Sequence, residues 1–192
     1  MKWYKRTGLA VLLAAVAVIS STLLSTHIKF GDRCSELTDG FYYGYTADES
    51  VSGEDEEGIA AYISGIMAYA EKMEGLVEKY QDSEAERDFR YEINGMKNAF
   101  EYNEKDISYI NFCYEDLIKK LHTTGIVLGS SDMSEEDAAL LEKYKADISE
   151  AEEKIKNSSY NDHVRAFRRE YDRFPLSWLE DNYIVDFPDY FS

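Results

Sequence analysis

The chain begins with a continuous apolar segment. Residues 8–24 read GLAVLLAAVAVISSTLL and carry no charged side chain, and the apolar character continues to Ile28. A helix of about 21 residues is roughly 31 Å long, which matches the hydrocarbon core of a bilayer. Trp3 and Tyr4 precede this segment, where interfacial aromatic residues are common. The pattern predicts one membrane-spanning helix through residues 8–28.

A cleaved signal peptide is the rival interpretation, because a basic start followed by an apolar run is typical of both. The stretch STLLSTHIKF shows no small-x-small cleavage site followed by a break, which favours an uncleaved anchor. Three basic residues precede the segment, whereas only Lys29 and Arg33 follow it closely. This asymmetry favours a cytoplasmic N-terminus and a single-pass protein of the cell membrane whose remaining residues lie on the extracytoplasmic side.

Beyond the anchor, apolar positions recur at intervals of three and four residues, the period of an amphipathic helix. They predict one helix from about Gly53 to Gln81, a second from about Glu84 to Thr124 and a third from about Glu135 to Phe174. In the second helix the steps alternate over more than four heptads, which predicts a single rod roughly 60 Å long. Its apolar seam comprises Phe89, Ile93, Met96, Phe100, Asn103, Ile107, Ile110, Tyr114, Leu117 and Leu121.

Each predicted helix starts at a serine with an acidic residue three positions later. A serine side chain can accept from an unpaired N–H of the first turn, and an acid favours the positive end of the helix. The three pairs are Ser52 with Asp55, Ser83 with Glu86 and Ser134 with Asp137. Gly125 is the predicted C-cap of the second helix, and Phe174-Pro175 ends the third, because proline disfavours helix at the preceding residue.

Two positions interrupt the regular pattern. Asn103 is the one polar member of the seam, and it either fixes the register of the helix or reaches water. The step from Ile155 to Tyr160 breaks the phase of the third helix by one residue. It predicts a bend, a stutter or a change of packing partner at residues 157–159.

Together these elements predict an all-α fold, with one N-terminal transmembrane helix followed by a long antiparallel helical bundle. The expected parts are the anchor with its basic flank (1–29), a helix extension and loop (30–53), the bundle (54–176) and an aromatic, acidic tail (177–192). Folding of the tail back against the bundle is the default, because its apolar surface is costly to leave in water. Binding to a partner or to the membrane interface are the alternatives.

The charge distribution excludes some classes of partner. The formal net charge is −17, but residues 1–29 hold four basic residues and no acid, which leaves −21 on residues 30–192. Such a surface repels a phosphate backbone, so we expect no binding to nucleic acid. A solvated, self-repelling surface is the simplest interpretation, and a basic partner or divalent cations are the alternatives.

The sequence offers no recognisable catalytic or metal-binding motif. The three histidines, His27, His122 and His163, are not at metal-ligand spacing, and there is no phosphate-binding loop or nucleophile elbow. We therefore expect no enzymatic activity, no cofactor and no metal. Cys34 and Cys113 do not form a C-x-x-C pair, and a disulfide between them is an alternative only if the bundle lies outside the cell.

The C-terminal region, with NSSYNDHVRAFRREYDRFP and a final DFPDYFS, resembles the LemA family. The residues that match the family pattern are Tyr160-Asn161-Asp162, Val164, Phe167, the Phe174-Pro175 helix end and the aromatic finish Tyr190-Phe191. The chain departs from the family in GIAAYISGIMAYAEKM, which lacks the family's early proline, and in Leu176-Ser177-Trp178, which replaces an Asn-rich turn. The resemblance implies a bacterial membrane-anchored helical protein, whose relatives occur in membrane-protease and envelope-stress contexts.

Two functional hypotheses follow. In the first, the protein is a membrane-tethered scaffold or adaptor that presents residues 161–175 and the tail, including Trp178, to a protein partner of unknown identity. In the second, it is a sensor whose ligand binds the loop at residues 41–53, near Tyr42, Tyr43 and Tyr45. Association into a homo-oligomer is open in both.

Overall fold

The computed structural model describes residues 3–45, 56–103, 106–171 and 188–191. The regular secondary structure of these residues is helical, and an isolated antiparallel bridge joins Tyr45 to Glu56. The predicted all-α class is therefore confirmed. The chain divides into two compact units, Met1–Glu36 and Leu37–Ser192.

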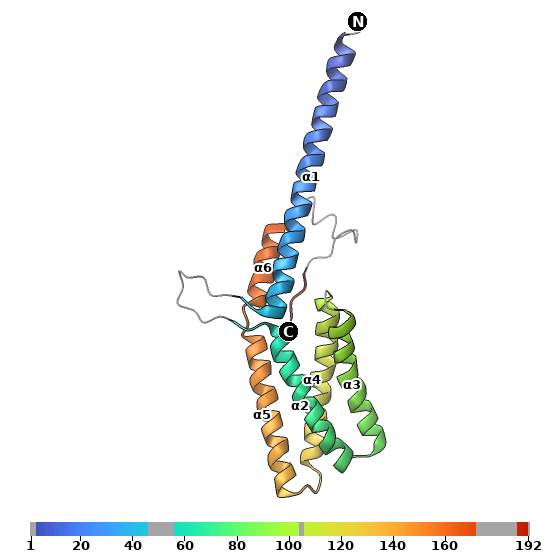
Figure 1. Cartoon of the computed structure of the whole chain (residues 1–192), viewed down its shortest axis with the longest axis vertical. Helices are drawn as coiled ribbons and strands as arrows, with labels where there is room; N and C mark the ends of the chain where they lie inside the picture. The colour runs from blue at the N-terminus through green and yellow to red at the C-terminus, as the bar shows by residue number, and fades with distance from the viewer. Residues whose placement is uncertain (1–2, 46–55, 104–105, 172–187, 192) are drawn as a thin grey trace. The chain divides into compact units, whose positions relative to one another are not determined.

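Helix α1, Trp3–Tyr43, contains all described residues of the first unit (Figure 1). Its last residues, from Leu37 on, belong to the second unit. Leu13–Tyr43 is the one stretch of the described chain that is long and apolar enough to cross a membrane, with a mean hydropathy of 1.5 in its most apolar window. A signal sequence near the N-terminus satisfies the same two criteria. The predicted continuation of the anchor helix through residues 30–40 is confirmed, because α1 runs on without a break.

Four helices of the second unit form the predicted antiparallel bundle, and the chain reverses direction from each to the next (Figure 1). They are α2 (Ile59–Tyr80), α3 (Ser83–Tyr102), α4 (Ile107–Gly129) and α5 (Glu135–Lys156). Helix α2 contacts the other three, α3 pairs with α4, and α4 with α5. A short sixth helix, α6 (Tyr160–Tyr171), follows α5 at the end of the bundle where α2 and α4 begin.

The bundle core consists of the apolar stripes that the sequence pattern predicts. Every long apolar residue of the predicted second seam is buried except Phe100, which is half-buried. In α2, Leu76 is buried, whereas Tyr62 and Met67 are half-buried. Burial of about 25 cal/mol per Å² of apolar surface makes these stripes the main source of stability.

The prediction of a single helix roughly 60 Å long is wrong, because the chain reverses between α3 and α4. Asn103 is not a seam residue but the C-cap of α3, with φ −132° and ψ 35° and its N–H bonded to the carbonyl of Ala99. Asp106 begins α4 by accepting from the Tyr109 N–H at 2.9 Å. Since Asn103 and Ile107 are four residues apart, the turn keeps the apolar phase of a continuous helix, and periodicity alone cannot reveal it.

The predicted caps have mixed outcomes. Ser134 caps α5 as predicted, accepting from the Asp137 N–H at 3.2 Å. At α3 the cap is Asp82, one residue before the predicted Ser83, and its carboxylate accepts from the N–H groups of Glu84 and Ala85. Gly125 is not a C-cap, because it is buried within α4, which continues to Gly129.

The first bundle helix begins later than predicted. Helix α2 starts at Ile59 after the N-cap Gly58, rather than near Gly53, and the predicted cap Ser52 lies outside the described residues. Before it, Tyr45 and Glu56 exchange two backbone hydrogen bonds of 3.1 and 3.0 Å. Phe41 to Tyr43 belong to the end of α1, so the predicted loop at residues 41–53 starts only after this helix.

The predicted break in the third helix is confirmed, and it is a complete interruption. Helix α5 ends at Lys156 with Asn157 as its C-cap, and α6 starts at Tyr160. The interruption lets Tyr160, Val164, Phe167 and Tyr171 form a separate buried face. The predicted end at Phe174-Pro175 lies outside the described residues.

Gly44 allows the chain to turn between α1 and the Tyr45–Glu56 bridge. Its φ of 81° is unfavourable for a residue with a side chain, and an added Cβ would lie 1.6 Å from the carbonyl oxygen of Glu56.

We predict that Gly44→Ala lowers the free energy of unfolding by about 2 kcal/mol or more. Gly65→Ala is the matched control, because this glycine lies within α2 with open space around it. In urea unfolding monitored by circular dichroism, the control should be neutral or stabilising by about 0.5–1 kcal/mol. Equal effects of the two substitutions would contradict this role of Gly44.

Asp137 links the end of α2 to the start of α5. Its carboxylate accepts from Lys79, from the Tyr80 hydroxyl and from the Ser134 hydroxyl, and these hydrogen bonds lower its pKa to about 2. Since the folded-state pKa is depressed, the stabilisation is fully present above the ordinary pKa near 4 and is lost as the pH falls toward 2.

We predict that Asp137→Asn lowers Tm at pH 7 and that the difference in Tm between this variant and the wild type narrows between pH 4 and 2.5. Glu135→Gln, at an exposed position of the same first turn, is the control. A Tm difference that stays constant to pH 2.5 would exclude this linkage.

Candidate interaction site at the C-terminal segment

Helix α6 forms one wall of the candidate site. The start of this helix is capped by Glu56, which is distant from it in the sequence. The Glu56 carboxylate accepts from the backbone N–H of Ser159 at 2.7 Å and from its hydroxyl at 2.5 Å. An acceptor is favourable here, because the first N–H groups of a helix have no partner within the helix. This cap connects the start of α6 to the segment that leads into α2.

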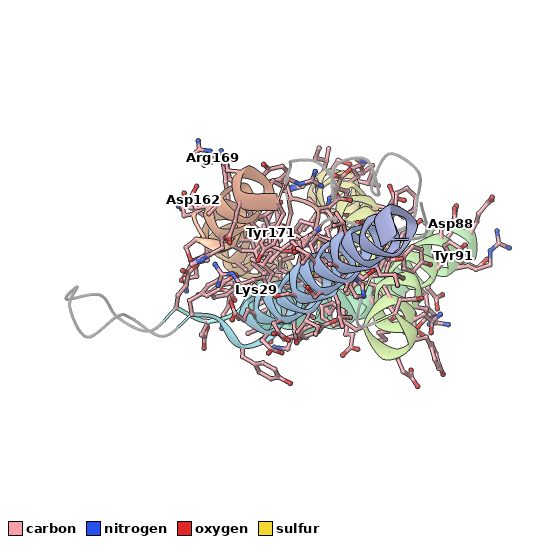
Figure 2. All side chains as sticks on the ribbon, turned by 90° about the horizontal axis from the view of Figure 1, so that it is seen from above. Lys29, Asp88, Tyr91, Asp162, Arg169 and Tyr171 are labelled. Carbon is pink, nitrogen blue, oxygen red and sulfur yellow. The ribbon has the colours of Figure 1, made fainter. Side chains whose placement is uncertain are left out.

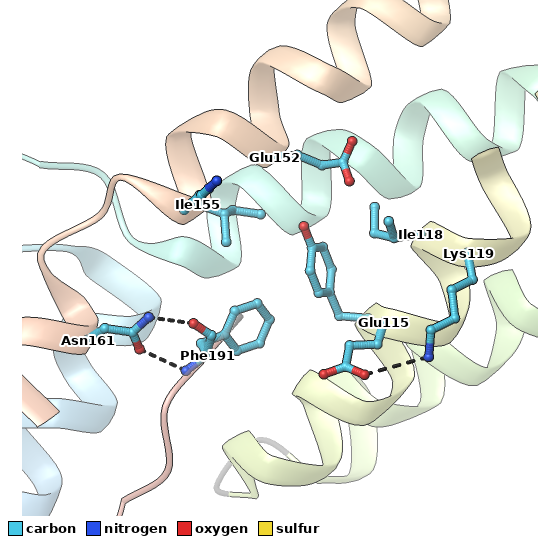
Figure 3. Close-up of a pocket in the computed structure, with 9 residues that line it drawn as sticks. Glu115, Ile118, Lys119, Glu152, Ile155, Asn161 and Phe191 are labelled. Atoms are coloured by element: carbon cyan, nitrogen blue, oxygen red, sulfur yellow. Dashed lines mark hydrogen bonds and ion pairs between the residues drawn. The ribbon is translucent and has the colours of Figure 1, made fainter.

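Asn161, on the first turn of α6, holds the backbone of Phe191 through two hydrogen bonds. Its amide nitrogen donates to the Phe191 carbonyl at 2.5 Å, and its amide oxygen accepts from the Phe191 N–H at 2.8 Å (Figure 3). A side-chain amide carries both a donor and an acceptor, so it can satisfy both backbone groups of one residue. Asn161 therefore pairs with the segment as a neighbouring β-strand would.

Asp189 and Pro188 are held by a second group of polar contacts. Arg168 donates from Nε to the Pro188 carbonyl at 3.0 Å and from its terminal nitrogen to the Asp189 carboxylate at 2.9 Å. The other oxygen of this carboxylate accepts from Ser108 at 2.6 Å, and the Asp189 carbonyl accepts from the Tyr160 hydroxyl at 3.3 Å. We call Ser108, Tyr160, Asn161 and Arg168 the tail clamp.

The Phe191 ring completes the contact from the apolar side. It is 1% exposed, with its centroid 5.3 Å from that of Phe41 and 5.0 Å from that of Tyr114. The Tyr160 ring lies edge-on to Phe41 at 5.6 Å. Burial raises the pKa of both Tyr114 and Tyr160, and the nearby carboxylates Glu152 and Asp189, respectively, raise them further. Both phenols therefore remain protonated at neutral pH, and Tyr160 keeps its hydrogen-bond donor.

An open groove of about 520 Å³ lies between α4 and α5, and Phe191 lines it (Figure 3). Its apolar lining consists of Tyr114, Ile118, Ile155 and Phe191. Charged side chains of both signs also line it, and they are Glu115, Lys119, Glu152 and Lys156. This combination of apolar surface and fixed charges is typical of a site that binds an amphipathic segment.

The structure brings together part of the set of residues that the sequence analysis selected. Tyr160, Asn161, Tyr190 and Phe191 meet at the C-terminal segment, where the Tyr190 ring lies 5.7 Å from the Arg168 guanidinium. Val164 and Phe167 are buried on the core side of α6 and do not form an exposed surface.

Asp162 lies apart from this set, and three selected residues fall outside the described chain. Asp162 points outward from α6 and pairs with Arg165 at 2.5 Å; Figure 2 shows it on the outer side of α6, like Arg169. Phe174, Pro175 and Trp178 lie outside the described residues. For residues 188–191 the expected folding back of the tail is confirmed.

Several residues of the site could not be selected from the sequence. Ser108 and Phe41 are distant from residues 188–191 along the chain, and no local pattern connects them. Arg168 sits on the polar side of the α6 pattern, where a solvated charge is the default interpretation. The one available signal is the unusual concentration of aromatic and acidic residues at 183–191, which indicated a packed tail without showing its receptor.

The residues proposed for a sensor site are packed largely within the fold. Phe41 is fully buried, and the Tyr45 ring stacks on that of His163 with centroids 3.8 Å apart. Tyr43 is 82% exposed, and residues 46–53 lie outside the described chain. Cys34 and Cys113 are both in the thiol form. Within the part of the chain that the structure describes, no group of three His, Cys, Asp or Glu side chains could hold a metal ion.

In comparisons with known proteins, no family model, curated protein or solved structure matches this chain. The resemblance to the LemA family thus remains a prediction from the residues at 157–175 and 186–192.

The double hydrogen bond of Asn161 can be tested by a substitution that conserves its shape. Asp at this position still accepts from the Phe191 N–H but cannot donate to the Phe191 carbonyl, so two oxygens face each other. We predict that Asn161→Asp lowers the free energy of unfolding by about 1–3 kcal/mol. Asp162→Asn, at the exposed neighbouring position, should change it by less than about 0.5 kcal/mol. Thermal melts of both variants provide the measurement, and equal stability of the two would refute the assigned role of Asn161.

Proposed function

We propose that the protein is a membrane-anchored scaffold or adaptor of the LemA type, without enzymatic activity, whose helical bundle presents a surface to a protein partner. The groove between α4 and α5 is the observation that carries this proposal. In this arrangement α1 is the anchor, its N-terminus is cytoplasmic and the bundle is extracytoplasmic. The support for this orientation is the excess of basic residues before the apolar segment.

The groove suits one apolar anchor of a partner. Ile118 is half-buried and Ile155 is almost completely buried, so Ile118 is the one of the two that offers apolar surface to a partner side chain. Binding energy at protein interfaces concentrates in a few anchors of this kind, surrounded by polar contacts. The lining pairs Lys119 with Glu115 at 3.7 Å, and Lys156 provides a further charge to orient a partner.

Charge determines the class of partner that we propose. Residues 30–192 carry a net charge of −21, which favours the approach of a basic segment and repels an acidic one. The Glu152 carboxylate, which lines the groove, contacts His122 at 3.1 Å, and Glu115, which also lines it, is half-buried. The expected partner is therefore an amphipathic segment with an apolar anchor residue and flanking lysine or arginine residues.

In-cell crosslinking of the full-length protein, followed by mass spectrometry, tests this proposal. Ile118→Asp places a charge in the groove, whereas Val127→Asp places one on an exposed position of the same helix as a matched control. We predict one dominant partner with the wild type and the control, and at least a tenfold loss of that partner with Ile118→Asp. Circular dichroism must show that both variants are folded. A partner captured equally by all three proteins would rule out the groove as its binding site.

A further inference from the structure

The tail clamp recognises a very short segment of chain. Six hydrogen bonds join it to three residues, Pro188, Asp189 and Phe191, and each of these receives at least one. Protein interfaces commonly carry about one hydrogen bond per 100–200 Å², so this density is high for so short a segment. The residues that make these bonds belong to α4 and α6, outside the segment itself.

The contacts also define which side chains the site selects. The residue at 189 must be acidic, because Arg168 and Ser108 share its two carboxylate oxygens. The residue at 191 must be a large ring, because Phe41 and Tyr114 contact it on a buried surface. The residue at 190 is held less strictly, since Tyr190 is 43% exposed and its ring approaches only the Arg168 guanidinium.

We infer that the tail clamp is a peptide-recognition site for a segment of the form Asp-aromatic-Phe. In this structure the chain's own residues 188–191 fill the site. When two copies of the chain associate, the same residues of the second copy occupy it. The bonds to Asn161 and Arg168 are local to residues 188–191, so none of them requires the segment to be covalently continuous with α6. Exchange of an identical element between copies is a common low-cost route to association.

A tethered segment competes strongly with a free one. Covalent linkage commonly provides an effective concentration of about a millimolar, so the wild-type site is occupied by its own tail. The site becomes available to an added peptide only when the tail is weakened. Phe191→Ala does this without altering any residue of the tail clamp.

The experiment measures fluorescence anisotropy of a labelled peptide, Phe-Pro-Asp-Tyr-Phe-Ser, with the sequence of residues 187–192, against the full-length protein in detergent micelles. We expect the Phe191→Ala protein to bind this peptide at least tenfold more tightly than the wild type does. Replacing Phe191 by Ala in the peptide, or adding Asn161→Ala to the protein, should each reduce binding at least tenfold. Adding Asp162→Ala instead is the matched control and should leave binding unchanged, because Asp162 faces solvent beside Asn161.

A second measurement applies if Phe191→Ala impairs folding. A chain truncated after Phe187 is melted with and without a saturating concentration of the peptide, and the peptide should raise its Tm because it binds only the folded state. No binding by a folded Phe191→Ala protein would overturn the inference, as would equal binding of a scrambled peptide. A truncated chain that the peptide neither folds nor stabilises would overturn it too. Phe191 and Asn161 also line the groove, so the proposed partner is tested separately, by Ile118→Asp in a chain whose tail is intact.

Discussion

The pairing of the Asn161 side chain with the backbone of Phe191 determines how one end of the bundle is assembled. An irregular segment that packs against helices must satisfy its backbone groups outside any ladder, since an unpaired buried N–H or carbonyl is costly. Asn161 satisfies one of each in a single contact. Once the backbone is fixed there, the Phe191 ring lies between Phe41 and Tyr114 and closes the core where α2 and α4 begin. The groove that carries the proposed function has Phe191 in its lining, so it depends on the same contact.

At this end of the molecule, one kind of interaction supplies stability and another determines which residues pair. Apolar burial of the α6 face supplies most of the stabilisation, but it specifies only that an apolar face must be covered. The hydrogen bonds that Glu56 accepts and that Ser108 and Arg168 donate contribute less energy each and determine which residues meet. Charge-assisted bonds of this kind have strict geometry and therefore favour one arrangement over similar apolar packings.

The sequence predicts the buried faces well and the chain reversals poorly, for a physical reason. Periodicity reports which side of a helix avoids water, and it identified most of the buried apolar residues of the bundle helices. It reports nothing about the direction of the chain, so the reversal between α3 and α4, which preserves the apolar phase, is indistinguishable from a continuous helix. The break after Lys156 changed the phase and was therefore visible. In the site, Tyr160, Asn161 and Phe191 were selected by their resemblance to a known pattern, whereas Ser108, Arg168 and Phe41 depend on tertiary contacts that no local signal encodes.

The paired backbones of Tyr45 and Glu56 have a consequence for how the chain can vary in length. Their two hydrogen bonds bring together the ends of a ten-residue connection, 46–55, and fix the distance between those ends independently of what lies between them. The entropy lost on closing such a connection grows only with the logarithm of its length, so doubling it costs roughly 0.6 kcal/mol. Insertions at this position would leave the Gly44 turn and the start of α2 unchanged. Added sequence, natural or engineered, is therefore accommodated at this connection at little cost to the core.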